Sequence, residues 1–278
     1  MTSPADPWRK NAAQWHRIGP PLRPVADDLA IVEEAAEEWR AAHAGRPLRA
    51  LILGVTPELC TLPWPAGTAL VAVDRSPDMI REVWPETGLP KGASAIAADW
   101  RDLPFPDGAF DLIAGDGCYS LLPFPDDYRI FGTEMRRVLA PEGRFLMRAF
   151  VQPAKRESAD AVGEALWSGR IGSFHAFKWR LAMSLQPSTA QGVRLADVWD
   201  AWHSICPDPA ALGERLGWPL DTITTIDAYR GAPAHYNFPS VAELRAILAG
   251  HFIEIACHTP SYELGDRCPT LVARRKDS

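Results

Sequence analysis

The sequence of 278 residues has few cysteines, and none of them are spaced as metal or redox pairs. The count is odd, the spacing is wide and no C-x-x-C pair occurs. This pattern argues against a disulfide framework and against a zinc site, so we expect no bound metal and a reducing, cytoplasmic location. The five are Cys60, Cys118, Cys206, Cys257 and Cys268.

The sequence also lacks a basic excess and any long apolar run. Its net charge of −6 provides no global field to attract nucleic acid or anionic lipid. No apolar stretch approaches the roughly 20 residues that span a bilayer. The N-terminal stretch MTSPADPWRKNAAQW is polar, contains two prolines and does not read as a signal peptide. We therefore expect neither a nucleic-acid nor a membrane partner.

An alternation of strand and helix patterns dominates residues 25–150. Hydrophobic residues make up 47% of the chain, enough for a core without disulfides or metals. Strands that alternate with helices predict an α/β fold with a parallel sheet and helices on both faces. The predicted strands are 49–54, 69–74, 93–97, 110–114, 143–150, 251–257 and 270–274, and the main predicted helices are 25–44, 57–62, 77–84, 127–139 and 241–250.

The alternation of strands and helices is absent from residues 155–230, which show helical patterns and no clear strand. Five of the eleven tryptophans fall here, which suggests a pocket lined partly by aromatic groups, although aromatic residues at helical spacing also form ordinary core. We predict an irregular N-terminal strap (1–24), a nucleotide-binding-type domain (25–150 and 236–278) and a helical insertion (151–235). The insertion follows the fifth strand, so it begins at the ligand-binding edge and is expected to roof the site.

Asp74 ends the second predicted strand, about 20 residues after Gly54. A carboxylate in this position accepts hydrogen bonds from ribose hydroxyls, or else caps the next helix. Arg75 and Met79 would flank the adenine or the sugar, and Met79 also suits the core. The G-x-G-x-x-G pattern of dinucleotide sites is absent, so a nicotinamide oxidoreductase is the weaker reading.

Two more loops carry candidate ligand groups. Asp99 follows the third strand and can accept from the exocyclic amine of adenine, while Trp100 can pack on the ring or simply on the protein. After the fourth strand, Asp116 stands between glycines in Gly115-Asp116-Gly117. Glycines allow close backbone approach to a ligand, and Asp116 either forms the turn or faces the cofactor.

These segments together resemble class I S-adenosylmethionine (SAM)-dependent methyltransferases. The resemblance rests on "LILG", "VAVDRSPDMI", "AADWRDLPFPDGAFDLIAGDG" and "EMRRVLAPEGRFLMRAF" in this order, and covers roughly residues 46–150. It implies a doubly wound, mostly parallel seven-stranded sheet with SAM as cofactor. It further implies that Gly54 belongs to the loop around the methionine part, Asp74 to the ribose and Asp99 to the adenine.

The first loop departs from that family. Such enzymes usually have an acid two residues before G-x-G-x-G, whereas here Ile52 replaces the acid, and Thr56 and Glu58 replace the later glycines. Thr56-Pro57 suits the start of a helix after Gly54-Val55. Glu58 either accepts from the SAM ammonium or only stabilises its own helix. Arg23 would pair with the SAM carboxylate if the strap folds over the site.

The methyl acceptor is expected to be a small molecule. Transfer is an in-line displacement, assisted by a base when the acceptor is a hydroxyl or a protonated amine. A SAM-binding protein of the same fold without turnover is the alternative, supported by the altered glycine loop. The leading candidate bases are His175, His203, Tyr119 and His235, and Tyr229 and Tyr236 are further candidates. Each of the six also suits a structural role.

Overall fold

The fold was determined as a computed structural model, which describes residues 8–276. Seven strands form one sheet in the order β3-β2-β1-β4-β5-β9-β8. The first five run parallel, while β9 is antiparallel to both of its neighbours. This confirms the predicted mostly parallel seven-stranded sheet. The strands are β1 (Arg49–Leu53), β2 (Ala69–Asp74), β3 (Ser94–Ala97), β4 (Phe110–Asp116), β5 (Leu139–Arg148), β8 (Phe252–His258) and β9 (Thr270–Arg275).

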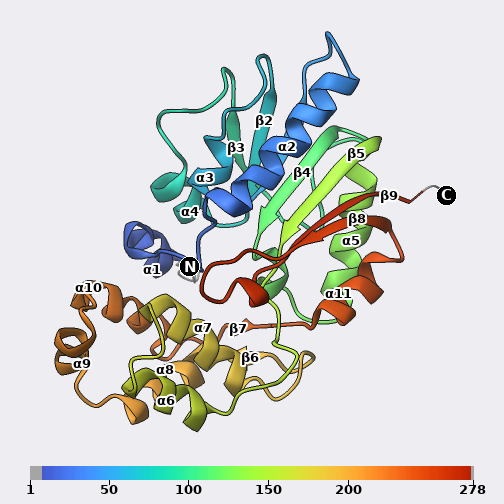
Figure 1. Cartoon of the computed structure of the whole chain (residues 1–278). Coiled ribbons are helices and arrows are strands. Elements are labelled where there is room, and N and C mark those ends of the chain that lie inside the picture. Colours follow the sequence, from blue (N-terminus) through green and yellow to red (C-terminus); the bar gives the residue numbers. More distant parts are fainter. Residues whose placement is uncertain (1–7, 277–278) are drawn as a thin grey trace, which may run out of the picture.

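Helices cover both faces of the sheet (Figure 1). Alternate residues of β1 explain why, since Ala50 and Ile52 pack on one face and Leu51 and Leu53 on the other. Helix α2 lies across the first face with α3 and α4, and α5 and α11 cover the second. Their bounds are α2 (Ala26–Ala42), α3 (Pro57–Cys60), α4 (Pro77–Val83), α5 (Asp126–Val138) and α11 (Val241–Leu248).

A separate helical group lies beyond the carboxyl ends of the parallel strands (Figure 1). It has its own core, in which Phe174, Phe177 and Trp202 pack edge to face. Its elements are α6 (Ala159–Trp167), α7 (Phe174–Leu185), β6 (Val193–Arg194), α8 (Leu195–Ile205), α9 (Pro209–Leu216), α10 (Leu220–Ile223), η3 (Thr224–Tyr229) and β7 (His235–Tyr236).

Three local expectations were wrong. The N-terminal segment contains α1 (Arg9–Ala13) and η1 (Trp15–Arg17) rather than only irregular chain; residues 1–7 of the predicted strap lie outside the described residues. β6 lies in the stretch expected to lack strands, and it pairs with β7 over only two residues, too few for a sequence pattern. β5 begins at Leu139, directly after α5, four residues earlier than predicted.

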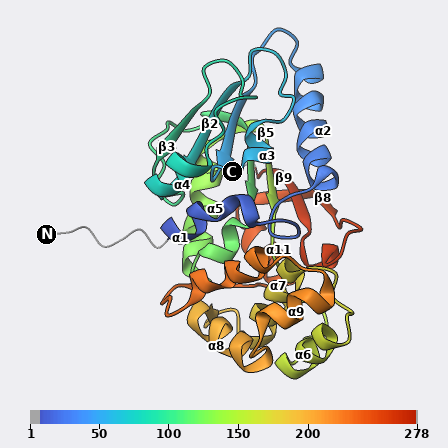
Figure 2. The same ribbon diagram turned by 90° about the vertical axis from the view of Figure 1, so that its left-hand side faces the viewer.

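The N-terminal segment is held between the sheet edge and the helical group (Figure 2). Gln14 Nε2 donates to the Thr225 carbonyl at 2.8 Å, and His175 Nε2 lies 3.0 Å from the Arg17 carbonyl. Helix α1 also contacts α4 beside the sheet. The segment therefore bridges two parts of the molecule at the edge where the parallel strands end.

Candidate functional site

A cavity lies at the carboxyl ends of β1, β2, β3 and β4, and we call it the first cavity. Nine of the eleven predicted cofactor residues line it; Glu58 and Gly117 do not. The sequence did not identify the others, although Trp8 and Trp15 stood out as tryptophans in a polar leader. The lining residues are Trp8, Trp15, Leu53, Gly54, Val55, Thr56, Asp74, Arg75, Met79, Asp99, Trp100, Asp116, Leu121 and Leu122.

Gly54 lies where three of these side chains converge. Its φ is +91°, a conformation that side-chain-bearing residues rarely adopt. A Cβ at this position would lie 3.9 Å from Asp74 Oδ2, 3.9 Å from Thr56 Oγ1 and 4.0 Å from Trp100 Cζ2. The first loop thus keeps the one glycine at which its backbone approaches the other walls of the cavity.

Backbone contacts hold Asp74 and Trp100 in place. Asp74 Oδ1 accepts from the Ser76 N–H at 2.8 Å, and Ser76 caps α4 by accepting from the Met79 N–H. The indole N–H of Trp100 donates to the Val73 carbonyl at 2.7 Å. This leaves the apolar surface of the indole to form the cavity wall.

Asp99 is paired within its own loop. Arg101 Nε and Nη2 lie 2.9 and 2.5 Å from the two Asp99 carboxylate oxygens. The Arg101 hydrogen bonds lower the Asp99 pKa, so the side chain is an anion at neutral pH. An adenine amine would therefore have to share these oxygens with the guanidinium.

The glycines around Asp116 are needed for protein packing. A Cβ on Gly115 would lie 2.7 Å from Met147 Cε, and one on Gly117 would lie 2.5 Å from Phe150 Cε2. β4 also extends through Asp116, two residues beyond the predicted end. Packing alone thus explains both glycines, and the approach of their backbone to a ligand stays a prediction.

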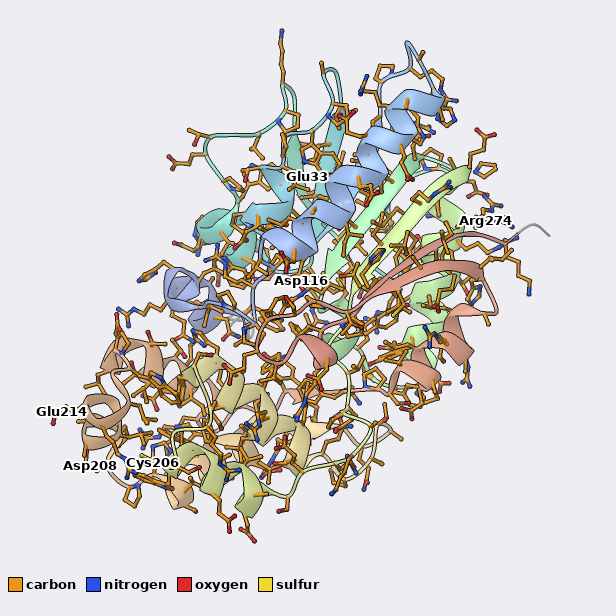
Figure 3. All side chains as sticks on the ribbon, in the orientation of Figure 1. Glu33, Asp116, Cys206, Asp208, Glu214 and Arg274 are labelled. Atoms are coloured by element: carbon orange, nitrogen blue, oxygen red, sulfur yellow. The ribbon has the colours of Figure 1, made fainter. Side chains whose placement is uncertain are left out.

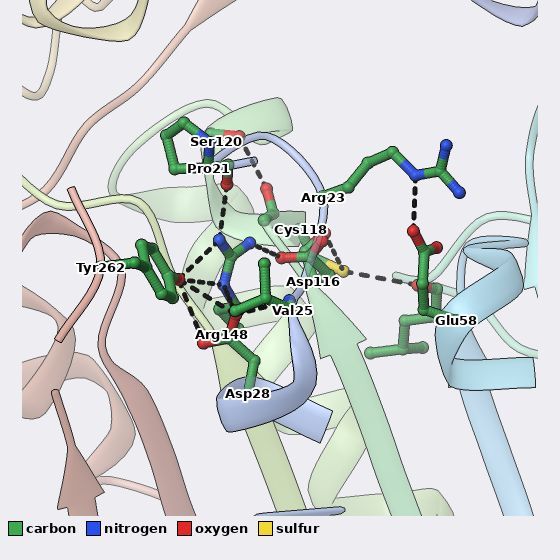
Figure 4. A network of polar contacts seen from close by, with 12 residues as sticks. Pro21, Arg23, Val25, Asp28, Glu58, Asp116, Cys118, Ser120, Arg148 and Tyr262 are labelled. Atoms are coloured by element: carbon green, nitrogen blue, oxygen red, sulfur yellow. Dashed lines mark hydrogen bonds and ion pairs between the residues drawn. The ribbon is translucent and has the colours of Figure 1, made fainter. Parts of the chain in front are cut away.

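Asp116 belongs to a buried polar network around Arg148 (Figure 4). Arg148 Nη1 donates to Asp116 at 2.6 Å, and Nη2 donates to the Pro21 carbonyl at 2.5 Å. Arg148 also pairs with Asp28 at 3.3 Å. The Tyr262 hydroxyl accepts from Arg148 and donates to Asp28. Burial raises the Asp116 pKa, which Arg148 partly offsets. The network ties the N-terminal segment and α2 to the end of β5.

Arg23 and Glu58 pair with each other. Arg23 Nε lies 2.6 Å from Glu58 Oε1 (Figure 4). The Arg23 guanidinium also packs over the Trp15 ring, 5.5 Å from its centroid. Glu58 Oε2 is buried without a hydrogen-bond partner among the described residues. The sequence allowed Glu58 to accept from the SAM ammonium and Arg23 to pair with the SAM carboxylate, but here the two side chains are each other's ionic partner.

Among the described residues, three of the four leading candidate bases line neither the first cavity nor the larger one beside it. Tyr119 is fully buried against Tyr128 and Phe131. His203 Nδ1 lies 2.9 Å from the Trp199 carbonyl, within its own helix. His175 bonds to the N-terminal segment, and burial lowers its pKa to about 4.

His235 is the fourth candidate, and it lines the larger cavity, as does Tyr236. This second cavity has a volume of about 600 Å³ and shares Trp8, Arg75, Leu121 and Leu122 with the first. Its other walls come from α1, from the start of α5 and from residues 228–237 of the helical group. The two cavities are therefore neighbours across a mainly apolar boundary.

The first cavity fits SAM in charge. Asp74, Asp99 and Asp116 line it against one cation, Arg75. SAM carries a sulfonium, an ammonium and a carboxylate, so its net charge is positive and suits an acidic lining. Figure 3 shows Asp116 inside the molecule, between the sheet and the helical group. No group of three or more potential metal ligands occurs among residues 8–276.

Comparisons with known proteins agree with this fold. Residues 53–147 match the family model described as a methyltransferase domain, while no curated protein matches the sequence. A SAM-dependent methyltransferase from Aquifex aeolicus shares 13% identity and a TM-score of 0.50 over 97% of this chain and 98% of its own. A SAM-dependent methyltransferase from Methanosarcina mazei shares 14% identity and a TM-score of 0.50, over 91% of this chain and 98% of its own.

A third solved structure has the highest of these three TM-scores. It is a Rhodobacter sphaeroides protein assigned to the zinc-dependent alcohol dehydrogenases, with 14% identity and a TM-score of 0.57 over 96% of this chain and 98% of its own. At such low identities, structural likeness shows the fold alone. The domain match and the order of the motifs carry the family assignment. Residues 53–147 thus match a methyltransferase domain, and this match supports a family of class I SAM-dependent methyltransferases.

Proposed function

We propose that this methyltransferase transfers the methyl group of SAM to a small-molecule acceptor held in the second cavity. The observation that carries the proposal is the first cavity, where nine residues predicted from four separate motifs meet at one sheet edge. Such an edge is where open α/β sheets bind their ligands. The adjoining second cavity, of about 600 Å³, has the size of a small-molecule site.

The residues of the first cavity have distinct proposed roles. Asp74 accepts from the ribose hydroxyls, and Asp99 and Trp100 receive the adenine. The backbone of Gly54-Val55-Thr56 runs beside the methionine part, with Asp116 opposite. These roles rest on the position of each residue at the end of its strand and on the acidic lining.

The protein's contribution to the reaction is mainly alignment and the exclusion of water. When bound, SAM would supply a methyl group carried on its sulfonium sulfur. The sulfur would keep the electron pair of the broken bond and become a neutral thioether. Leu121, Leu122 and Trp8 line both cavities and form an apolar passage between them. Their surfaces shield the line of attack from solvent. His235, the one leading candidate on the second cavity, is the proposed base for an acceptor that must lose a proton.

We further propose that residues 151–235 act as the acceptor-side cap and that the N-terminal strap moves on SAM binding. The first cavity has a volume of about 100 Å³ with Trp8 and Trp15 in its walls. Pockets for ligands of this size usually exceed roughly 300 Å³. An outward shift of residues 8–17 would provide the missing room, and five of these ten residues are exposed.

A SAM-binding protein without turnover is the second candidate. Two observations favour it: Thr56 and Glu58 stand where the family has glycines, and Arg23 pairs with Glu58 at 2.6 Å. Such a protein would bind SAM and its product, S-adenosylhomocysteine (SAH), but would not consume SAM with any acceptor.

Calorimetric titration with SAM, SAH and NAD tests the first step of the proposal. We expect saturable binding of SAM and SAH and none of NAD. Absence of SAM and SAH binding would overturn both candidate functions. Release of SAH from SAM in the presence of an acceptor then separates the enzyme from the non-catalytic binder.

We also propose a reducing, intracellular setting, supported by five free cysteines, four of them buried. None of the helices within residues 8–276 has the length and apolar character to cross a membrane.

A further inference from the structure

The second cavity is basic in an acidic protein. Acidic residues outnumber lysine and arginine by 35 to 29 over the whole chain. Around this cavity the balance among the described residues is reversed, because five lysine or arginine side chains face a single carboxylate, Asp127. The five are Arg9, Lys10, Arg75, Arg101 and Arg230.

Only one of these five cations forms an ion pair among the described residues. Arg101 Nη1 lies 2.5 Å from Asp127 and its Nη2 lies 2.5 Å from Asp99, so Arg101 uses the carboxylate of the described lining. Arg9, Lys10, Arg75 and Arg230 form no ion pair within residues 8–276, although the charge of Arg75 also acts on Asp99 of the first cavity and helps to lower its pKa. Arg230 packs over the Trp199 ring at 5.2 Å, which orders the side chain but leaves its charge unpaired.

The four unpaired cations come from three separate parts of the chain. Arg9 and Lys10 lie on α1, Arg75 follows β2, and Arg230 follows η3 in the helical group. A random solvated surface of this composition would intersperse acids among them. Their convergence on one cavity requires the N-terminal segment, the sheet edge and the helical group together, and it creates a local positive field.

The neighbouring cavities thus have opposite charge. Asp74, Asp99 and Asp116 line the first cavity and suit a cationic methyl donor, whereas the second attracts an anion. Between them lie the apolar side chains of Leu121 and Leu122. An acceptor that spans this arrangement has an apolar reacting end and an oxyanion at the other end.

Resting on the proposed function, we infer that the methyl acceptor is a small organic anion, with a carboxylate or phosphate group held by Arg9, Lys10, Arg75 and Arg230. Tyr236, which also lines the second cavity, and Trp8 offer ring surfaces for its apolar part. In the transfer, a lone pair on the acceptor forms the new bond to the methyl carbon as the carbon–sulfur bond breaks. The acceptor proton passes to a base or water, and the oxyanion is unchanged.

The test uses the full chain saturated with SAH and three probes of one shape: benzoate, phenyl phosphate and neutral benzamide. We expect one or both anions to bind about tenfold more tightly than benzamide at low ionic strength, with the preference falling as salt is added. The relative affinities of benzoate and phenyl phosphate show which oxyanion the site prefers.

The triple variant Arg9→Gln, Lys10→Gln, Arg230→Gln removes three of the cations and spares Arg75, which also lines the SAM cavity. All three side chains are exposed, so folding should be preserved. We expect the variant to lose the preference for anions and to bind SAH as the wild type does. The control is the triple variant Lys91→Gln, Lys155→Gln, Arg170→Gln. It has the same net charge as the first variant, but its three changes lie outside both cavities, so it should keep the preference for anions.

The outcomes separate this inference from the proposed function. Three results would each overturn the inference: equal binding of benzamide and the anions, no saturable binding of either anion, or an unchanged preference for anions in the Arg9→Gln, Lys10→Gln, Arg230→Gln variant. In each case SAH binding would still support the methyltransferase. Failure of the wild type to bind SAH would overturn the proposed function itself, and this inference with it.

Discussion

The Arg23 guanidinium lies 2.6 Å from the Glu58 carboxylate, and this pair joins the N-terminal segment to the first turn of α3. The Glu58 side chain does not line the first cavity. The geometry therefore favours a structural role for Glu58 over contact with the SAM ammonium.

We predict that Glu58→Gln changes SAM affinity by less than about threefold, because an amide can still accept from Arg23 and no direct ligand contact is lost. Calorimetric titration with SAM measures the effect. A Glu58→Gln/Arg23→Met double-mutant cycle, followed by thermal unfolding, measures the coupling of the pair. A tenfold loss of affinity in Glu58→Gln alone would instead assign the carboxylate to the ammonium.

Asp74→Ala should weaken SAM binding by at least about tenfold, because a carboxylate that accepts from two ribose hydroxyls contributes more than one neutral hydrogen bond. Asp78→Ala is the matched control, since Asp78 lies in the first turn of α4 and outside the first cavity. Titration of both variants with SAM decides the matter. Similar affinities in the two variants would contradict the ribose assignment.

Gly54→Ala should lower both stability and SAM affinity. The positive φ of +91° costs an alanine about 1–2 kcal/mol, and the new methyl would face Asp74, Thr56 and Trp100. Gly45→Ala provides the control, with φ +83° and no atom within 4 Å of the added Cβ. Its midpoint of thermal unfolding should fall similarly while SAM affinity stays unchanged. Equal SAM affinity in both variants would exclude close approach at Gly54.

Arg148→Met should destabilise the fold by about 3–5 kcal/mol, because it leaves the buried Asp116 and Asp28 without their cation. Urea unfolding followed by circular dichroism measures this loss. Arg144→Met, on the same strand, removes only bonds to the carbonyls of Glu142 and Gly143, and should cost less than about 1 kcal/mol. Equal losses would show that the network adds nothing specific.

Lys178 presents the opposite case, a buried cation without a carboxylate partner within residues 8–276. It contacts Thr225 Oγ1 at 3.4 Å and the Tyr229 ring at 5.3 Å, and burial lowers its pKa to about 7 from 10.5. Between pH 7 and 10.5 the Lys178 amine is protonated in the unfolded chain and neutral in the folded chain. Wild-type stability should therefore rise with pH across this window.

Lys178→Met should accordingly stabilise the protein by about 2–4 kcal/mol at pH 7, with a gain that shrinks toward pH 10.5. Urea unfolding of both proteins at pH 7, 8.5 and 10 measures the difference. A destabilised variant, or a gain independent of pH, would mean that Lys178 has a partner or role in the helical group that its burial does not reveal.

Local sequence patterns predicted most of the sheet and one wall of the site. The first four parallel strands are short, mainly apolar runs, and Asp74 ends β2 while Asp99 follows β3 by two residues. The strands and the positions of these two carboxylates therefore follow from neighbours in the chain. The cap on α4 was predictable for the same reason, because Ser76 bonds to an N–H three residues away. The weakest local signals, at α1 and the two-residue strands, were missed.

Contacts between distant segments determined the rest. Arg23 and Glu58 are 35 residues apart, and Phe150 fills the space beside Gly117. Neither contact produces a periodic pattern in the sequence. Tyr119 follows Asp116 by three residues in the chain, yet its ring packs in the core beside Tyr128. The basic second cavity exists only because α1, the loop after β2 and the end of η3 meet.

The sequence by itself thus determined the strands, their polar ends and the family motifs, since each depends on residues a few positions apart. Only the tertiary structure decided which charges neutralise one another, which glycines are needed for packing and which candidate base lines a cavity. Those outcomes depend on burial and on the distance between side chains from separate segments, and no local pattern encodes either quantity.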